Sequence, residues 1–292
     1  MSEIGVVKER MDLLRGWLQR RLPGDAVAWI DEQVARIAAG PSGLALARAV
    51  GLAPRKIGRQ PLQLDASEMA AARACRAGLD ASDWTMEQAG RVLFALASYE
   101  HAQATFADRL DALVRSGEIG EQIALLRGLP LYPGSGGLLS IAGEGIRSAM
   151  QPVYEAVAHR NPFPLEEFTE AMWNQMVVKA LFIGSTLAPI QGIDERRNGE
   201  LARMLLDYAH ERWAAGRPVS PELWRCVGPF AVAGDDFDDL LRVFSSGEAT
   251  ERRAAALALA ECPTPQALVA LEATPELWRE IRSGKLTRET LA

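Results

Sequence analysis

The sequence contains few cysteines and lacks long apolar runs. Its three cysteines, Cys75, Cys226 and Cys262, are far apart and odd in number, so they predict neither a disulfide framework nor a CxxC metal site. Residues 1–22 carry a charge every few positions, and no uncharged run reaches about 18 residues. We therefore expect no signal peptide and no membrane insertion, and a reducing cytoplasm is the expected location.

Clustered positive charge is also missing. The net charge is −6, the isoelectric point is near 5.3, and no long basic run is present. Because nucleic-acid binding depends on Lys and Arg side chains that neutralise phosphates, nucleic acid is not an expected partner. At 292 residues, of which 48% are hydrophobic and 24% charged, the chain can bury one large core or two smaller ones. This composition is typical of an ordinary soluble globular protein.

The period-two alternation of β-strands is scarce, whereas Ala, Leu, Arg and Glu are abundant, so we predict an all-α fold. Short helical patterns follow one another at 66–78, 85–98, 106–117 and 119–128. Residues 249–271 repeat this style, with Pro263 at the turn. The favoured architecture is an irregular α-α superhelix of HEAT-like helical repeats around a central buried helix. A helical bundle is the alternative.

Composition divides the chain into four regions, which alternatively form one continuous domain. The regions are an N-terminal helical segment (1–64), a helical repeat region (65–128), a central block (129–230) and C-terminal HEAT-like helices (231–292). The first region ends in a stretch interrupted by glycine and proline, which is typical of a linker. The central block differs from its flanks in its tryptophans and in the placement of its polar residues.

The central helix is predicted over 168–183, FTEAMWNQMVVKALFI, where apolar residues occupy two sides. Gln175 and Lys179 lie within one apolar side, and Asn174 lies on a flank. Burying such groups without partners costs roughly several kcal/mol. We therefore interpret this segment as a core helix that carries polar groups toward an internal site.

Two flanking helices carry further polar residues. The helix expected over 138–158 has a polar stripe that includes Arg147, and Pro152 should kink or break it. The helix expected over 199–216 places Asp207 three residues before His210, so the carboxylate can hold the imidazole in one tautomer.

The runs WNQMVVKALF (173–182) and IQGIDERRNGELARMLLDYAHERWAAGRPVSPELWRCVGPF (190–230) resemble the EboA family of bacterial metabolite-traffic proteins. LPLYP, EGIRSAMQPVYEA and NPFP, which precede them, fit the same pattern. The resemblance implies a link to secondary metabolites or precursors that reach the periplasm, and a neighbouring prenyltransferase-like membrane protein as partner. Ten positions match the family's polar and aromatic pattern: Arg147, Asn161, Trp173, Asn174, Gln175, Lys179, Asp207, His210, Arg212 and Trp213.

We hypothesise that these ten residues form a ligand site. In this interpretation Arg147, Gln175, Lys179 and His210 converge on an anionic or polyhydroxylated metabolite or a lipid-linked intermediate. A buried hydrogen-bond network that fixes helix packing is the structural alternative. The expected function is non-catalytic binding or scaffolding, with no catalytic residues, cofactor or metal, in the cytoplasm or at a membrane through a partner.

Two other functions stay open at this point. One is an enzyme of the same pathway, in which Asp207 and His210 act as an acid–base pair. The other is a protein–protein adaptor that works through its helical repeats.

Two motifs favour a structural interpretation. Asp235, Asp236 and Asp239 spell the DDxxD of all-α prenyl transferases, but no second metal motif accompanies them. These carboxylates are better explained as residues that stabilise a helix N-terminus. The segment 132–137, YPGSGG, lacks the Lys of a P-loop and is expected to be a plain loop.

Overall fold

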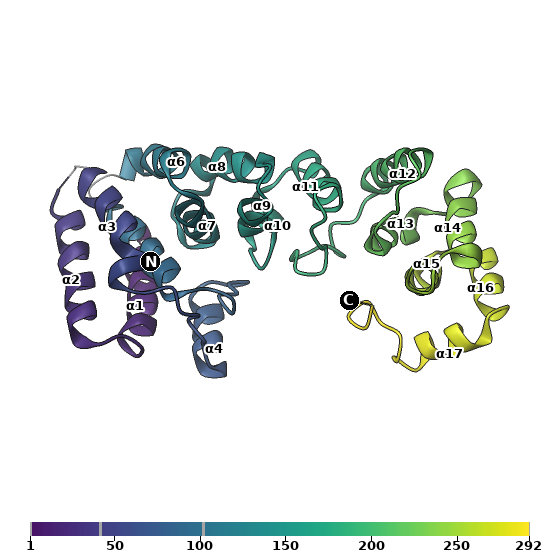
Figure 1. Ribbon diagram of the computed structural model, residues 1–292, viewed down its shortest axis with the longest axis horizontal. Coiled ribbons are helices and arrows are strands. Elements are labelled where there is room, and N and C mark those ends of the chain that lie inside the picture. The colour runs from purple at the N-terminus through teal and green to yellow at the C-terminus, as the bar shows by residue number, and fades with distance from the viewer. Residues whose placement is uncertain (1, 41–42, 101–102, 292) are drawn as a thin grey trace. The chain divides into compact units, whose positions relative to one another are not determined.

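The computed structural model describes residues 2–40, 43–100 and 103–291, which divide into two compact units, Met1–Thr169 and Glu170–Ala292 (Figure 1). The all-α prediction is confirmed, because the described residues form 17 α-helices and no strand beyond an isolated bridge between Pro61 and Thr85. Successive helices pack on their neighbours within each unit, consistent with an α superhelix. The HEAT-like character of the repeats and the four expected regions stay predictions.

The first unit contains ten α-helices among its described residues. They are α1 (Glu3–Gln19), α2 (Gly24–Ala38), α3 (Gly43–Lys56), α4 (Ala66–Cys75), α5 (Met86–Ala97), α6 (Phe106–Ser116), α7 (Ile119–Arg127), α8 (Ser135–Arg147), α9 (Gln151–Ala158) and α10 (Phe163–Glu167), with the 3-10 turns η1 (Gln103–Thr105) and η2 (Leu129–Leu131). Helix α5 is buried from Glu87 to Ala97 and packs against α1, α2, α3 and α7. Its two charged groups pair within the core, where Arg91 Nη1 lies 2.5 Å from Glu87 Oε2.

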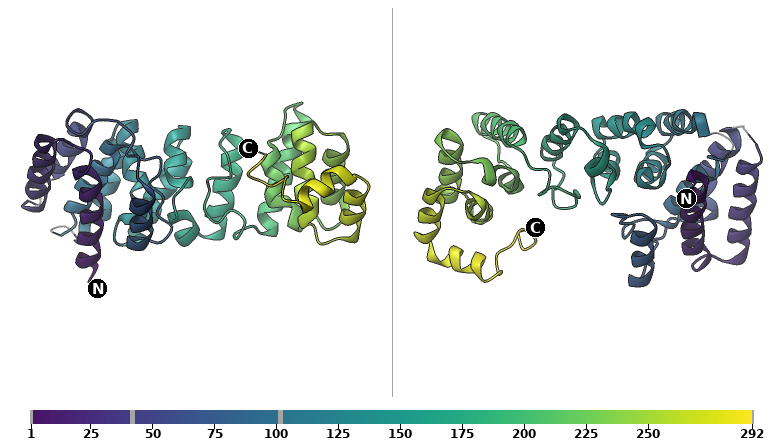
Figure 2. Two further views of the ribbon diagram at one scale, coloured as in Figure 1. Left: turned by 90° about the horizontal axis from the view of Figure 1, so that it is seen from below. Right: turned by 180° about the vertical axis from the view of Figure 1, so that it is seen from behind.

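The second unit is built around α15. Its helices are α11 (Glu170–Phe182), α12 (Gly199–Ala214), α13 (Trp224–Val227), α14 (Gly234–Ser246), α15 (Ala249–Glu261), α16 (Pro265–Glu272) and α17 (Pro275–Arg282), with the 3-10 turns η3 (Pro221–Leu223) and η4 (Gly228–Phe230). Helix α15 is buried from Ala254 to Leu259 and packs against α13, α14, α16 and α17. The yellow segment after α17 lies beside the green helices of its own unit in both views of Figure 2. Leu286 of that segment is 1% exposed, which anchors it to the core.

Helix α11 occupies most of the predicted segment 168–183 but buries mainly one side. Trp173, Met176 and Val177 are fully buried, whereas Gln175 and Phe182 are exposed. The predicted burial of Gln175 is therefore wrong. Both sides of this helix are apolar in sequence, so the pattern alone did not indicate which one packs against α12.

The helix expected over 138–158 is two helices, α8 and α9, as the presence of Pro152 predicts. The chain leaves the helical conformation at residues 148–150, and α9 begins at Gln151. Pro152 thus lies in the first turn of α9, where a missing backbone N–H costs nothing.

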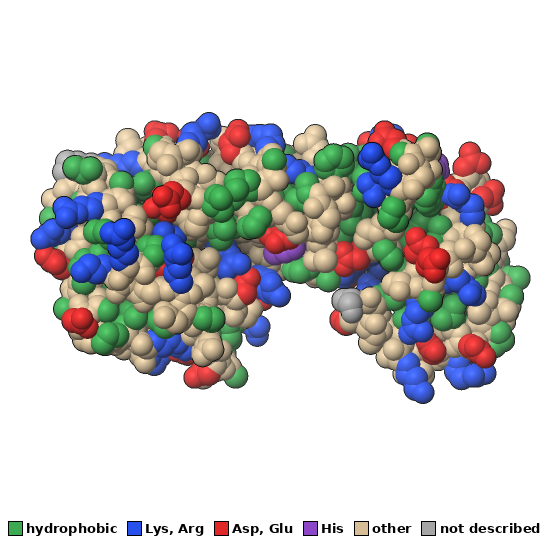
Figure 3. Space-filling model, in the orientation of Figure 1, with side chains coloured by type: hydrophobic (Ala, Val, Ile, Leu, Met, Phe, Trp, Pro, Cys, Tyr) green, Lys and Arg blue, Asp and Glu red, His purple; other side chains and the backbone are tan. Residues whose placement is uncertain are grey.

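The surface of each unit is mixed in charge. Figure 3 shows Lys and Arg side chains interspersed with Asp and Glu side chains over the visible face of both units. No helix among the described residues combines the length and apolarity needed to span a lipid bilayer.

Candidate functional site

Two of the ten predicted site residues, Arg147 and Asn161, belong to the first unit, and the other eight belong to the second. The Arg147 side chain is 64% exposed and pairs with Glu144 at 2.5 Å. Asn161 is buried, and its amide donates to the carbonyls of Leu126 and Ala156 at 3.3 and 3.2 Å. Its Oδ1 accepts from the backbone N–H of Phe163 at 3.0 Å, so Asn161 fixes the turn before α10.

Asn174 joins two helices of the second unit. Its Nδ2 donates to Asn198 Oδ1 at 3.1 Å, and Asn198 Nδ2 donates back to Asn174 Oδ1 at 2.9 Å. Asn198 Oδ1 also accepts from Leu201 N at 2.8 Å, which caps α12. The buried amide of Asn174 therefore positions the start of α12.

The neighbouring residues of α11 divide between core and surface. Trp173 is 0% exposed, and the guanidinium carbon of Arg196 lies 4.7 Å from its ring centroid. Trp173 Nε1 is buried and has no hydrogen-bond partner among the described residues. Lys179 is partly exposed and Gln175 is exposed, so this helix does not direct all its polar groups inward.

The expected pairing of Asp207 with His210 does not form. Asp207 accepts from Arg203 at 2.9 Å, one helical turn earlier, whereas the His210 ring contacts the Asp239 carboxylate. Both Asp207 and His210 are exposed. Asp239 also accepts from Arg242 of its own helix at 2.9 Å, so this aspartate of the DDxxD sequence contacts α12 through His210 and forms an ion pair within α14.

Trp213 packs in an aromatic and cationic cluster between α12, α13 and α14. Its ring stacks on Trp224 at 6.3 Å, and the Arg242 guanidinium lies 4.0 Å from its centroid. Arg212 donates to the carbonyl of Pro218 at 3.0 and 2.9 Å, so it secures the turn after α12. These contacts stabilise the helix arrangement locally.

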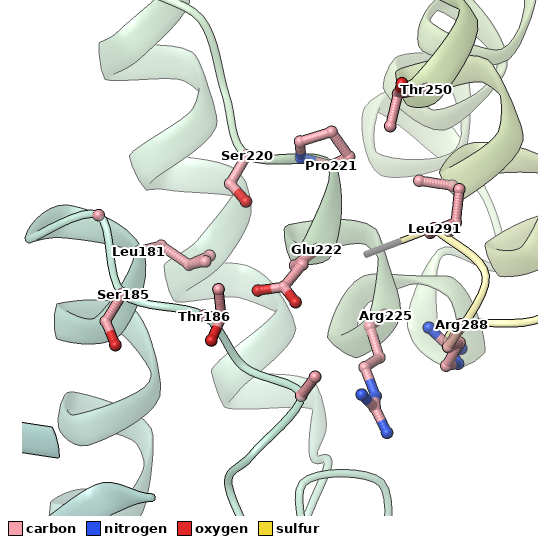
Figure 4. A pocket seen from close by; sticks show the side chains of 13 residues that line it. Leu181, Ser185, Thr186, Ser220, Pro221, Glu222, Arg225, Thr250, Arg288 and Leu291 are labelled. Carbon is pink, nitrogen blue, oxygen red and sulfur yellow. The ribbon is translucent and has the colours of Figure 1, made fainter.

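The second unit contains a pocket of about 500 Å³ formed by other residues. The segment after α11, the turn η3, helix α13, the start of α15 and the segment after α17 contribute to it (Figure 4). Its lining residues are Leu181, Gly184, Ser185, Thr186, Ala188, Ser220, Pro221, Glu222, Arg225, Thr250, Ala254, Arg288 and Leu291. None of the ten predicted residues is among them.

Glu222 is the acidic residue of this pocket. Figure 4 shows its carboxylate directed toward the middle of the pocket, with Ser220 and Thr186 on the same side. Glu222 Oε2 accepts from the backbone N–H of Leu187 at 2.6 Å. Its Oε1 forms no further hydrogen bond with the described residues, so it is available to a donor group of a ligand.

The arginines of the pocket already have carboxylate partners. Arg225 donates to both Asp194 oxygens, at 2.8 and 2.5 Å, and this hydrogen bonding lowers the pKa of Asp194. Arg288 Nη2 lies 2.7 Å from Glu261 Oε1, with an orientation that does not suit a hydrogen bond. Arg197 contacts Glu261 and donates to the Arg225 carbonyl at 3.0 Å. These ion pairs hold in place the side of the pocket that Arg225 and Arg288 form.

A nearby buried thiol and several apolar side chains complete the surroundings of this pocket. Cys226 lies next to Arg225 in sequence, but burial raises its pKa to about 12, so the thiol stays protonated at neutral pH. Leu181, Pro221 and Leu291 provide apolar surface for the body of a ligand. No group of three or more His, Cys, Asp or Glu side chains within the described ranges is placed to hold a metal ion.

The sequence analysis did not select Glu222 or Arg225, although both lie in the stretch 190–230 that carries the family resemblance. The sequence pattern that could have identified them is short. Glu222 sits directly after Ser220 and Pro221, a combination that begins a short helical turn and can orient a carboxylate.

A protein-family model described as "Metabolite traffic protein EboA" matches residues 10–228 of the chain. No curated protein and no solved structure matches the chain.

Proposed function

Because the chain belongs to the EboA family, which is described by metabolite traffic, we propose that it binds a small metabolite without transforming it. The proposed site is the pocket of the second unit. The free Oε1 of Glu222 in a pocket with apolar walls carries the proposal. A volume of about 500 Å³ lies within the range of small-molecule sites, about 300–1,000 Å³.

The lining chemistry supports a ligand that donates hydrogen bonds. Glu222 accepts only, and the Ser220 and Thr250 hydroxyls donate or accept. Arg225 and Arg288 already face carboxylates, so the pocket offers little uncompensated positive charge. A largely apolar molecule with hydroxyl or amine groups suits this site better than an anion. Transfer of that molecule to a membrane partner of a secondary-metabolite pathway is part of the same proposal.

Glu222→Gln tests the site. The substitution keeps an oxygen for Leu187 N–H but removes the charge, so affinity should fall roughly 10- to 100-fold, the equivalent of about 1.5–3 kcal/mol. The measurement is native mass spectrometry of protein co-expressed with its neighbouring pathway genes, with ligand occupancy compared between wild type and variant. Glu211→Gln, on the exposed side of α12, is the matched control and should retain the ligand.

Two outcomes contradict the proposal. Equal ligand occupancy in wild type and Glu222→Gln would place the ligand elsewhere. Conversion of a bound metabolite by purified protein, abolished in His210→Ala, would favour the enzyme alternative over a binding function.

A further inference from the structure

Arg10 of α1 is a partly buried arginine of the first unit. Its Nη1 donates to the Leu131 carbonyl at 2.9 Å, and it forms no ion pair with any described residue. The Nε atom is buried and has no hydrogen-bond partner within the described part of the chain. Burial and the nearby Arg76 charge lower the pKa of Arg10, against the opposing effect of the Cys75, Glu9 and Glu3 side chains. A guanidinium with unused donors in such surroundings is unfavourable unless something else satisfies them.

Four other largely covered arginines of this unit are paired. Their carboxylate partners are Glu68 for Arg21, Glu166 for Arg76, Glu87 for Arg91 and Asp83 for Arg127. Each of these four side chains is at most 22% exposed. Arg10, in contrast to these four, has no carboxylate within ion-pair distance among the described residues, which points to a partner from outside the chain.

Arg10 lines a cavity of about 380 Å³. Arg76, Pro130, Gly134 and Ser135 line it as well, and Gly134 is the N-cap of α8 without a side-chain cap. The first N–H groups of a helix carry partial positive charge, which adds to that of the two guanidiniums.

Two carboxylates also line this cavity, Glu3 and Glu167, but neither forms an ion pair with Arg10 within the described part of the chain. Glu3 accepts from the Tyr99 hydroxyl at 2.6 Å, and Arg76 is held by Glu166. Among the side chains that line the cavity, the Arg10 guanidinium is therefore the cation that has no carboxylate within ion-pair distance in the described residues. Its planar donor arrangement matches a phosphate or carboxylate group.

We propose that the cavity at Arg10 is an oxyanion site that binds the phosphate or carboxylate group of a small molecule. The site is separate from the Glu222 pocket, which belongs to the other unit. The two proposals are therefore tested independently of each other. Arg10 supplies the charge and several donors, and Arg76 adds a second positive charge.

Isothermal titration of the full chain with phosphate, pyrophosphate and citrate, at ionic strength matched with sodium chloride, tests the proposal. The wild type should bind at least one of these anions, and Arg10→Met should weaken that binding at least tenfold. Arg10→Lys retains the charge but not the planar donor arrangement, so it should recover part of the affinity. Arg48→Met, a change of equal charge at an exposed position of α3, should alter affinity less than twofold.

Three results would overturn the site: no binding of any of the three anions by wild type, equal binding by Arg10→Met, or equal losses in Arg10→Met and Arg48→Met. Circular dichroism checks that each variant folds. If Arg10→Met fails to fold, the comparison of Arg10→Lys with wild type decides, because a purely structural charge would leave anion affinity unchanged in Arg10→Lys.

Discussion

Glu68 links the end of α1 to the start of α4 through one carboxylate. It accepts from Arg20 at 2.7 Å, from Arg21 at 2.8 Å, and from the Asp65 backbone N–H at 3.0 Å, which completes the capping box of α4. Its side chain is 7% exposed. The hydrogen bond from Arg21 lowers the pKa of Glu68 from 4.5 to about 2. The folded state therefore holds this proton more weakly than the unfolded state does.

This shift predicts a pH dependence of stability. The contribution of Glu68 is complete above pH 4.5 and is lost as the pH falls toward 2. Glu68→Gln should lower the free energy of unfolding by about 1–3 kcal/mol at pH 7 and flatten the decline at acid pH. Urea denaturation followed by circular dichroism at pH 7 and pH 3 measures both effects.

Glu32→Gln is the control for this prediction. Glu32 pairs with Arg36 on α2, and both side chains are more than half exposed, so its loss should cost less than about 0.5 kcal/mol. Equal losses for Glu68→Gln and Glu32→Gln would show that burial of the Glu68 pair adds nothing.

At the residue scale, sequence spacing predicts local contacts better than distant ones. Arg203 and Asp207 pair at 2.9 Å because residues four apart are neighbours on a helix. His210 lies three residues after Asp207 and is also its neighbour on the helix, yet its partner is Asp239 of α14. Such a partner depends on how α12 and α14 pack, and one sequence does not encode that packing in any local pattern.

At the scale of elements, Gly228 sets the approach of η4 to α15. A Cβ atom at this position would lie 2.6 Å from the carbonyl oxygen of Ala258 and 2.8 Å from its Cα. Both atoms belong to backbone, so a rotamer change cannot relieve the clash. Helix α13 and α15, which flank this contact, carry Arg225 and Ala254 on two walls of the proposed metabolite pocket.

Gly228→Ala should therefore separate these elements. Overpacking of this kind costs about 1–3 kcal/mol, and the pocket should lose ligand because its walls move apart. Thermal unfolding and native mass spectrometry measure the two effects. Gly199→Ala, where the nearest atom would be 3.9 Å away, should leave stability and occupancy near wild type, and a similar loss there would refute the packing argument.

The sequence predicted where helices begin and end more reliably than which side of each helix is buried. The expected helices over 168–183 and 199–216 correspond to Glu170–Phe182 and Gly199–Ala214, because Asn198 and the glycines near their ends are recognisable limits. The exposed side of α11 was not predictable, since both of its sides are apolar. The Glu222 pocket was missed for a related reason: it combines segments from residue 181 to residue 291, a juxtaposition that periodicity does not reveal.

At the scale of the whole molecule, the family match and the two units divide the chain differently. The match covers residues 10–228, whereas the units separate between Thr169 and Glu170. The Glu222 pocket includes Thr250, Ala254, Arg288 and Leu291, which lie beyond the matched region. The proposed metabolite site therefore depends on the second unit as a whole and not on the matched segment alone.

Each unit has its own buried core, around α5 in the first and α15 in the second, so each should fold when expressed alone. Fragments 1–169 and 170–292 should show helical circular dichroism and cooperative thermal unfolding. Fragment 1–169 should retain pyrophosphate affinity within about threefold, because Arg10 and its cavity lie entirely within it. Fragment 170–292 should retain the metabolite. A fragment that folds but loses its ligand would mean that its site needs residues from the other unit, whereas a fragment that fails to fold would refute the independence of the two cores.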